Sequence, residues 1–244
     1  MAERLKGKTA IITGASSGIG WASAIALATE GANLVVTARR KDRLEELVAE
    51  IQEKGGKAIL VAGDAREEST AIETVEAAME TFGRLDILVN NAGRGAYKPI
   101  VEFSVEEYDE MMDTNMRSTF VFTRHAVPEM LAQKSGILLT VSSVAGVHGF
   151  AREAIYCSTK FAQRGFMQAL DNELRPSGIR VGLILPGGVK TEFAIGHGRT
   201  EEGVAASAML DAKDVAEAVL LACVQPEHSR IIEIRMRPMA EPLT

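Results

Sequence analysis

The chain has 244 residues, of which 46% are hydrophobic and 25% are charged, as expected of a globular protein with a sizeable core. Its 33 acidic and 27 basic residues give a formal net charge of −6. This argues against nucleic acid as the main partner, because phosphate binding needs a concentrated basic surface. No apolar run approaches the roughly 20 residues that span a bilayer, and the N-terminus lacks the apolar core of a signal peptide. We therefore expect a cytoplasmic protein that binds neither nucleic acid nor membrane.

Short β-rich runs alternate with longer helical patterns along the chain. The runs fall at residues 9–13, 33–38, 58–62, 86–90, 136–142, 180–185 and 230–235. Several are apolar at almost every position, which is typical of strands buried on both faces of a sheet. One helical pattern between them predicts a left-handed cap at Gly83 and a single buried stripe made of Ile72, Val75, Met79 and Phe82.

This alternation predicts a doubly wound α/β fold. Strands joined through helices make right-handed crossovers and form a parallel sheet that is covered on both faces. Because no linker, low-complexity tract or internal repeat interrupts the pattern, we expect residues 1–244 to form a single domain. The longest loop-like stretch, residues 191–210, suits a mobile lid over a ligand, although a plain connection fits almost as well.

Cysteine and histidine are sparse in this chain. There are two cysteines, Cys157 and Cys223, and four histidines whose spacing is not that of metal ligands. We therefore expect neither a disulfide framework nor a metal site.

A glycine-rich turn follows the first predicted strand. Glycines there let the backbone approach a pyrophosphate, while the N-terminus of the next helix directs N–H groups at the anion. The same residues would also serve a plain strand-to-helix turn. If the turn binds a dinucleotide, the contacts come from Gly14, Ser16, Ser17, Gly18, Ile19 and Gly20.

The end of the second predicted strand bears on the choice of dinucleotide. A site for NAD usually has an acidic residue there, whereas this chain has Ala38 followed by Arg39 and Arg40. Guanidinium groups bind phosphate through paired charge-assisted hydrogen bonds, so a ribose 2′-phosphate fits. Arg40 could equally belong to the solvated start of the next helix. The pattern nevertheless favours NADP(H) as the cofactor.

Five motifs follow one another at regular places along the chain. They are TGxxxGxG at 13–20, NNAG at 90–93, Asn115, Ser143 with the YxxxK pair Tyr156 and Lys160, and Pro186-Gly187 followed by Thr191. In order and spacing this series resembles the short-chain dehydrogenase/reductase family over nearly the whole chain. The resemblance implies a Rossmann-like sheet of seven parallel strands, and a homodimer or homotetramer joined through the helices that carry Asn115 and Tyr156.

The resemblance also implies which residues lie along the dinucleotide. Asp64 and Ala65 would lie near the adenine, and Asn91, Ala92 and Gly93 near the ribose. The nicotinamide end would be held by Val141, Tyr156, Lys160, Pro186, Gly187, Val189 and Thr191.

The motif residues suit carbonyl reduction, which needs a hydride on carbon and a proton on oxygen. Tyr156 and Lys160 are four residues apart and share one helix face. A nearby ammonium should lower the pKa of Tyr156 toward the pH at which a phenol exchanges its proton. Ser143 can hydrogen-bond the substrate oxygen as negative charge develops. By the resemblance, Asn115 would connect Lys160 to solvent through a water.

The substrate is expected to be a small carbonyl compound or alcohol that contacts Ser143, Tyr156, Gly188 and Phe193. Further candidates for the pocket are Arg94, Tyr97, Val144, His148 and Phe150. The sequence of residues 231–238, around the last predicted strand, departs from that of the 3-oxoacyl-carrier-protein reductases. It looks more like the NADP-dependent 3-hydroxy-acid dehydrogenases and small carbonyl reductases.

Three alternatives stay open on sequence grounds. The first is a 3-oxoacyl-carrier-protein reductase, and the second is a regulatory protein that binds NADPH without chemistry. The third is a methyltransferase, which would usually have an acidic residue where this chain has Ala38 and Arg39.

Overall fold

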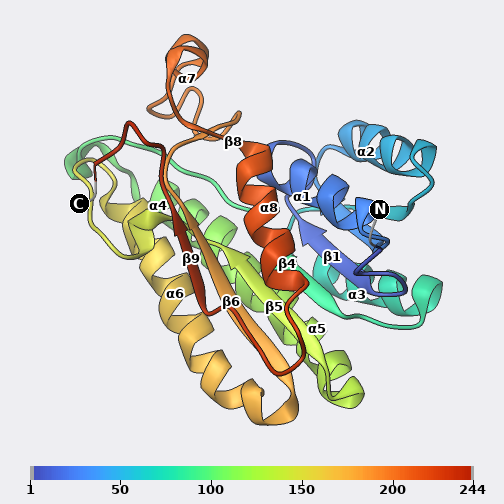
Figure 1. Cartoon of the computed structure of the whole chain (residues 1–244). Helices are drawn as coiled ribbons and strands as arrows, with labels where there is room; N and C mark the ends of the chain where they lie inside the picture. The colour runs from blue at the N-terminus through green and yellow to red at the C-terminus, as the bar shows by residue number, and fades with distance from the viewer. Residues whose placement is uncertain (1–2, 243–244) are drawn as a thin grey trace.

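A seven-stranded parallel sheet forms the centre of the computed structural model, which describes residues 3–242 (Figure 1). Its strands are, in spatial order, β3 (Lys57–Ala62), β2 (Asn33–Ala38), β1 (Thr9–Thr13), β4 (Ile87–Asn90), β5 (Gly136–Val141), β6 (Ile179–Pro186) and β9 (Glu233–Met236). All six pairings are parallel, so the predicted Rossmann-like sheet is confirmed. The seventh strand begins three residues later than predicted, although the Ile232 carbonyl already accepts a hydrogen bond from Leu183.

Burial follows the position of each strand in the sheet. The central strands β1, β4 and β5 are buried at every residue, which explains their almost wholly apolar sequences. The edge strands β3 and β9 are mostly half-buried, and β9 alternates polar with apolar residues.

Two sets of helices cover the two faces of the sheet. Buried residues of α1 (Gly18–Thr29), α2 (Lys41–Glu53) and α8 (Ala212–Cys223) pack in one core. Those of α3 (Glu68–Phe82), α5 (Ser118–Gln133) and α6 (Ala154–Leu174) pack in the other. This is the doubly wound arrangement. The shorter helix α4 (Val105–Met112) precedes α5, and a π-helical turn (Asp113–Arg117) joins the two. No helix in residues 3–242 is long and apolar enough to cross a membrane.

The apolar stripe predicted for α3 is partly wrong. Val75 is buried, but Ile72 is 36% exposed and turns away from the core. The buried face is instead made mainly of small residues, Thr70, Ala71, Thr74 and Ala78. Small side chains let the helix approach the sheet and α5 closely, so here packing distance outweighs hydrophobicity. Gly83 ends the helix in the left-handed conformation, with φ at 72°, as predicted.

The carboxyl ends of the strands share one edge, and the chain after β6 returns across it. A two-residue strand β7 (Val189–Lys190) pairs with β8 (Leu210–Asp211), and between them stands the short helix α7 (Glu201–Ala206). Figure 1 shows α7 projecting beyond this edge of the sheet. The segment 191–210 therefore lies beside the place where a doubly wound sheet binds its ligands.

Candidate active site

A cavity of about 910 Å³ lies over the carboxyl ends of β1 to β6. Ser143, Tyr156, Gly188 and Phe193 line it, together with every predicted cofactor residue except one. The exception is Gly20, which packs beneath the cavity floor. A Cβ at Gly20 would lie 2.5 Å from Asn91 Nδ2, so this glycine lets the turn and the NNAG segment meet.

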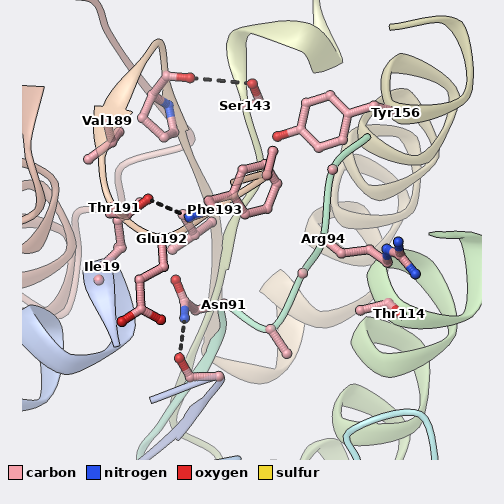
Figure 2. Close-up of a pocket in the computed structure, with 18 of the residues that line it drawn as sticks. Ile19, Asn91, Arg94, Thr114, Ser143, Tyr156, Val189, Thr191, Glu192 and Phe193 are labelled. Atoms are coloured by element: carbon pink, nitrogen blue, oxygen red, sulfur yellow. Dashed lines mark hydrogen bonds between the residues drawn. The ribbon is translucent and has the colours of Figure 1, made fainter. Parts of the chain in front are cut away.

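The turn after β1 packs closely against the NNAG segment that follows β4. Gly14 has φ at +65°, and a Cβ there would lie 2.8 Å from the Cα of Ala92. Thr13 Oγ1 accepts hydrogen bonds from the N–H groups of Asn91 and Ala92, both at 2.9 Å. The Asn91 side chain returns a bond to the Thr13 carbonyl, also at 2.9 Å. It donates to the Gly14 carbonyl as well, at 3.2 Å, so the NNAG segment is fixed against the turn (Figure 2). The turn is thereby fixed, and the N-terminus of α1 directly after it lines the cavity, where a pyrophosphate would bind.

The two arginines after β2 differ in their surroundings. The Arg40 guanidinium donates to Ser16 Oγ at 3.1 and 3.2 Å and pairs with Glu192 at 2.9 Å. Arg39 is exposed at the mouth of the cavity and helps to lower the pKa of Asp64. Both guanidinium groups thus border the end of the cavity nearest β2, where a ribose phosphate would lie.

Asp64 is held by Arg66 in a forked ion pair, with a shortest contact of 2.7 Å. Hydrogen bonds from Arg66 keep the pKa of this carboxyl below its ordinary value. The carboxylate is therefore charged at neutral pH, beside Ala65 and at the end of the cavity expected to take the adenine.

Ser143 and Tyr156 meet at the other end of the cavity. Ser143 Oγ accepts from the Ala145 N–H at 3.1 Å and donates to the Pro186 carbonyl at 3.4 Å. Figure 2 shows the Tyr156 hydroxyl turned toward Ser143. The Tyr156 ring is packed at a tilt against Phe193, with centroids 5.8 Å apart. Two hydroxyl groups from different elements thus converge on one point.

The pKa of Tyr156 departs from the sequence-based expectation. Burial raises it, and the hydrogen bond with Ser143 offsets only part of this effect. Lys160 does not lower it, because its Nζ lies 5.7 Å from the ring centroid and burial lowers the pKa of Lys160 itself to about 7. The expected lowering is therefore wrong for this structure, in which Tyr156 is a protonated phenol at neutral pH.

Lys160 is 3% exposed and makes two hydrogen bonds within the protein. Its Nζ donates to the Gln163 side-chain oxygen at 2.9 Å and to the Val141 carbonyl at 3.4 Å. Gln163 was not among the predicted residues, although it lies three positions after Lys160, where a helix brings side chains together.

Asn115 lies behind the cavity, on the π-helical turn, and is fully buried. Its side chain accepts from the Arg94 N–H at 2.8 Å and donates to the Arg94 carbonyl and to Thr159 Oγ1, both at 2.9 Å. The Asn115 carbonyl accepts from Gln163 Nε2 at 2.8 Å. Within the described residues, its link to Lys160 runs through the Gln163 amide.

The predicted pocket residues meet different outcomes. Tyr97, Val144 and Phe150 line the cavity. Arg94 also lines it, but its side chain points away from Tyr156 and pairs with Glu110 (Figure 2). The prediction for His148 is wrong, because it does not line the cavity and its main chain instead folds back onto Val144.

Several charged residues that line the cavity were not predicted from the sequence. They come from segments without a motif and are Glu153, Arg199, Arg237 and Glu241. Arg199 lies over the Tyr97 ring, 5.6 Å from its centroid, and Glu241 accepts from the Gly188 N–H at 3.0 Å. Among residues 3–242 there is no group of three or more His, Cys, Asp and Glu side chains that could hold a metal ion.

Residues 8–202 match the profile of the short chain dehydrogenases. The chain belongs to this family. An uncharacterized oxidoreductase of Staphylococcus aureus strain MRSA252 is 36% identical over 235 residues, which cover 96% of this chain and 99% of the relative. A similar protein of Staphylococcus epidermidis is 35% identical, with 97% and 99% covered.

Solved structures of dehydrogenases match the fold closely. The alcohol dehydrogenase of Thermococcus sibiricus, complexed with 5-hydroxy-NADP, has a TM-score of 0.88 and 31% identity, with 97% of this chain and 99% of that chain covered. The closed form of a serine dehydrogenase complexed with NADP+ has a TM-score of 0.90 and 30% identity, with 96% of each chain covered. This protein is therefore an oxidoreductase of the short-chain dehydrogenase family, and the methyltransferase alternative is set aside.

Proposed function

We propose that this protein is an NADP(H)-dependent oxidoreductase that interconverts a small ketone or aldehyde with the corresponding alcohol. The observation that carries the proposal is the convergence of the Ser143 and Tyr156 hydroxyls at one end of a dinucleotide-sized cavity. The glycine-rich turn that lines the cavity and the two arginines after β2 fit a phosphorylated dinucleotide. NADP or a derivative is bound in both structural relatives, and this supports the choice of cofactor.

The proposed roles follow from the contacts of each side chain. Ser143 holds the substrate oxygen by a hydrogen bond, and Tyr156 donates its phenolic proton to that oxygen as the carbon is reduced. With the dinucleotide bound, the Lys160 ammonium would bind the nicotinamide ribose and stabilise the negative charge left on Tyr156, an interaction that the cofactor-free structure lacks. Bound NADPH would supply the hydride. Pro186, Gly187 and the residues after them form the wall that would hold the nicotinamide ring.

The pKa values favour reduction of the carbonyl as the direction at neutral pH. Burial raises the pKa of Tyr156, so its hydroxyl keeps the proton that a general acid must donate. Alcohol oxidation needs the phenolate as a base and should therefore gain rate as the pH rises.

The proposal extends to location and assembly. Cys157 and Cys223 are buried free thiols, as is usual in a reducing compartment such as the cytoplasm.

The aromatic rings of Phe120 on α5 and Phe161 on α6 are 44% and 46% exposed, which supports self-association through these helices. Light scattering on the purified protein would separate a dimer or tetramer from the 26.2 kDa monomer.

The test is NADPH oxidation, followed at the nicotinamide absorbance, against 3-oxo esters, 3-oxoacyl thioesters, diketones, aldehydes, quinones and cyclic ketones. The thioester wells decide the 3-oxoacyl reductase alternative, and parallel NADH wells report on the choice of cofactor. We expect turnover with at least one carbonyl class.

The matched variant is Tyr156→Phe, which keeps the ring and removes the proton donor. We expect kcat to fall by about 10²- to 10⁴-fold, the range for loss of a general acid, with NADPH binding retained. Unchanged turnover in this variant would overturn the assigned role. NADPH binding without turnover of any carbonyl would favour the non-catalytic alternative.

A further inference from the structure

A buried amide joins the Lys160 ammonium to the main chain of the π-helical turn. Lys160 Nζ lies 2.9 Å from Gln163 Oε1, and Gln163 Nε2 lies 2.8 Å from both the Asn115 carbonyl and Thr119 Oγ1. Gln163 is 1% exposed and Asn115 is fully buried. A polar side chain in such a place must find all its partners within the protein.

These bonds determine which way the amide faces. Both hydrogens of Gln163 Nε2 are used, one by Asn115 and one by Thr119, so Oε1 is the atom left for the ammonium. The opposite orientation would set an N–H group against the hydrogens of Lys160 and an oxygen against the Asn115 carbonyl, and would lose both of those bonds. The amide thus offers Lys160 one acceptor at a fixed position.

The π-helical turn supplies the anchor at the far end. Its wider ring of hydrogen bonds changes the register between α4 and α5. The Asn115 carbonyl then accepts from Thr119 and Gln163, both at 2.8 Å, and more weakly from Ser118 at 3.5 Å. Asn115 is itself held by the Arg94 backbone, so the anchor is rigid. Gln163 therefore ties a flexible four-carbon side chain to a fixed piece of backbone.

The surroundings of Lys160 are polar but carry no charge. Tyr156, from the same helix, is the titratable group that faces it, with its ring centroid 5.7 Å from Nζ. Strand β5 presents the Val141 carbonyl, the loop after β4 presents Gly93, and the turn presents Asn115. In the described part of the chain no carboxylate contributes to the pKa of Lys160, which burial alone lowers to about 7. A neutral acceptor thus holds the ammonium in place and leaves its charge free to change.

We propose that Gln163 is a positioning residue, which fixes the Lys160 side chain beside Tyr156 and, because it is an amide and not a carboxylate, does so without pairing the charge of Lys160. The effect of Gln163 on catalysis rests on the proposed function. The contact between the Gln163 and Lys160 side chains does not depend on that function.

The first test needs no substrate and measures thermal stability against pH in the cofactor-free protein. In the wild type the folded-state pKa of Lys160, about 7, lies below its value in the unfolded chain, about 10.4. The unfolded chain therefore binds more protons between these values, and this group makes stability rise with pH in that window. In Gln163→Glu the new carboxylate favours the ammonium, raises its pKa and removes that rise.

We therefore expect the Tm of Gln163→Glu, relative to the wild type, to decline steadily from pH 7 to pH 10. Lys160→Met, which lacks the titrating group, should show the same flattened dependence. The control is Gln52→Glu at an exposed position of α2, whose Tm difference from the wild type should not vary in this window. A wild-type slope retained in Gln163→Glu would overturn the proposal.

The second test follows the pH profile of carbonyl reduction with ethyl 3-oxobutanoate, or the fastest carbonyl of the panel. In Gln163→Glu, we expect kcat to fall on the alkaline side at a pH at least one unit higher than in the wild type. In Gln163→Leu, which has a similar size but no acceptor, this alkaline fall should come at a lower pH than in the wild type. The maximum kcat should also fall at least tenfold.

The two tests separate the failure of this inference from failure of the proposed function. If no carbonyl is turned over, the proposed function fails and the stability profiles still decide the role of Gln163. If both variants share the wild-type pH profiles and only lose stability uniformly, Gln163 serves packing alone and the proposal is wrong.

Discussion

Arg40 holds Ser16 on one side and Glu192 on the other, across the mouth of the expected cofactor site. A ribose 2′-phosphate would take over these guanidinium hydrogens. We expect Arg40→Ala and Arg39→Ala each to weaken NADPH binding by about 10- to 100-fold, the scale of one charged hydrogen bond, while NADH binding changes little.

The measurement is a fluorescence titration of both cofactors, with Arg43→Ala as the control. Arg43 is on α2 near these arginines but pairs with Glu46 at the surface. Glu192→Gln should tighten NADPH binding, since it frees Arg40 from a competing carboxylate. Equal losses for NADPH and NADH would contradict the assignment of the arginines to the 2′-phosphate.

Among single residues of the site, the sequence predicts those that belong to motifs and misses those that the fold brings in from distant parts of the chain. Ser143, Tyr156 and Lys160 could be predicted because their spacing is itself the signal. Glu241 could not, because it reaches Gly188 from 53 positions away. Gln163 is an intermediate case, since a polar residue three positions after Lys160 on a buried helix face is visible in the sequence.

The turn between β1 and α1 depends on the backbone freedom of Gly14. An alanine there would have φ at +65° and a Cβ 2.8 Å from the Ala92 Cα. We expect Gly14→Ala to destabilise the fold by about 1–3 kcal/mol, the cost of a strained backbone site, and to abolish detectable NADPH binding. Urea unfolding and cofactor titration would measure the two effects.

Gly165 provides a matched control for that substitution. It lies on the exposed side of α6, and a Cβ added there would have no neighbouring atom within 4 Å, so Gly165→Ala should stabilise the helix by about 0.5–1 kcal/mol. If Gly14→Ala were as well tolerated as Gly165→Ala, the close approach of the two segments would not matter to the fold.

The elements of the sheet were predictable because fully buried strands must be apolar on both faces. The small pair β7 and β8 was not, since each strand has two residues and shows no periodicity. The stripe on α3 was misplaced at Ile72 for a related reason. Hydrophobic spacing identifies a helix, but how closely it packs depends on neighbours that are distant in sequence.

Asp86 ties the start of β4 to the N-terminal part of the molecule. It is 4% exposed and accepts hydrogen bonds from the Thr9 N–H, the Arg84 guanidinium and the Lys8 ammonium. Burial alone would raise its pKa, but these donors outweigh burial and hold it below the ordinary value. The carboxylate therefore stabilises the fold at neutral pH, and this contribution is lost as the pH falls through the lowered pKa.

We expect Arg84→Gln to lower the free energy of unfolding by about 1–3 kcal/mol at pH 7, because it removes donors from a buried charge. The difference from the wild type should shrink at pH values low enough to protonate Asp86. Urea unfolding at pH 7 and in acid would measure both, with Arg43→Gln, at an exposed ion pair, as the control. A loss that stayed constant with pH would show that Arg84 acts through packing.

The π-helical turn at Asp113–Arg117 makes the fold sensitive to any insertion or deletion in this segment. A π turn closes its hydrogen bonds over one more residue than an α turn. Deleting a single residue here would let α4 and α5 merge into one regular helix, and the wide turn that presents the Asn115 carbonyl to Thr119 and Gln163 would be lost. Asn115 would then leave Arg94 and Gln163. The segment should consequently tolerate substitutions at its exposed positions far better than any insertion or deletion.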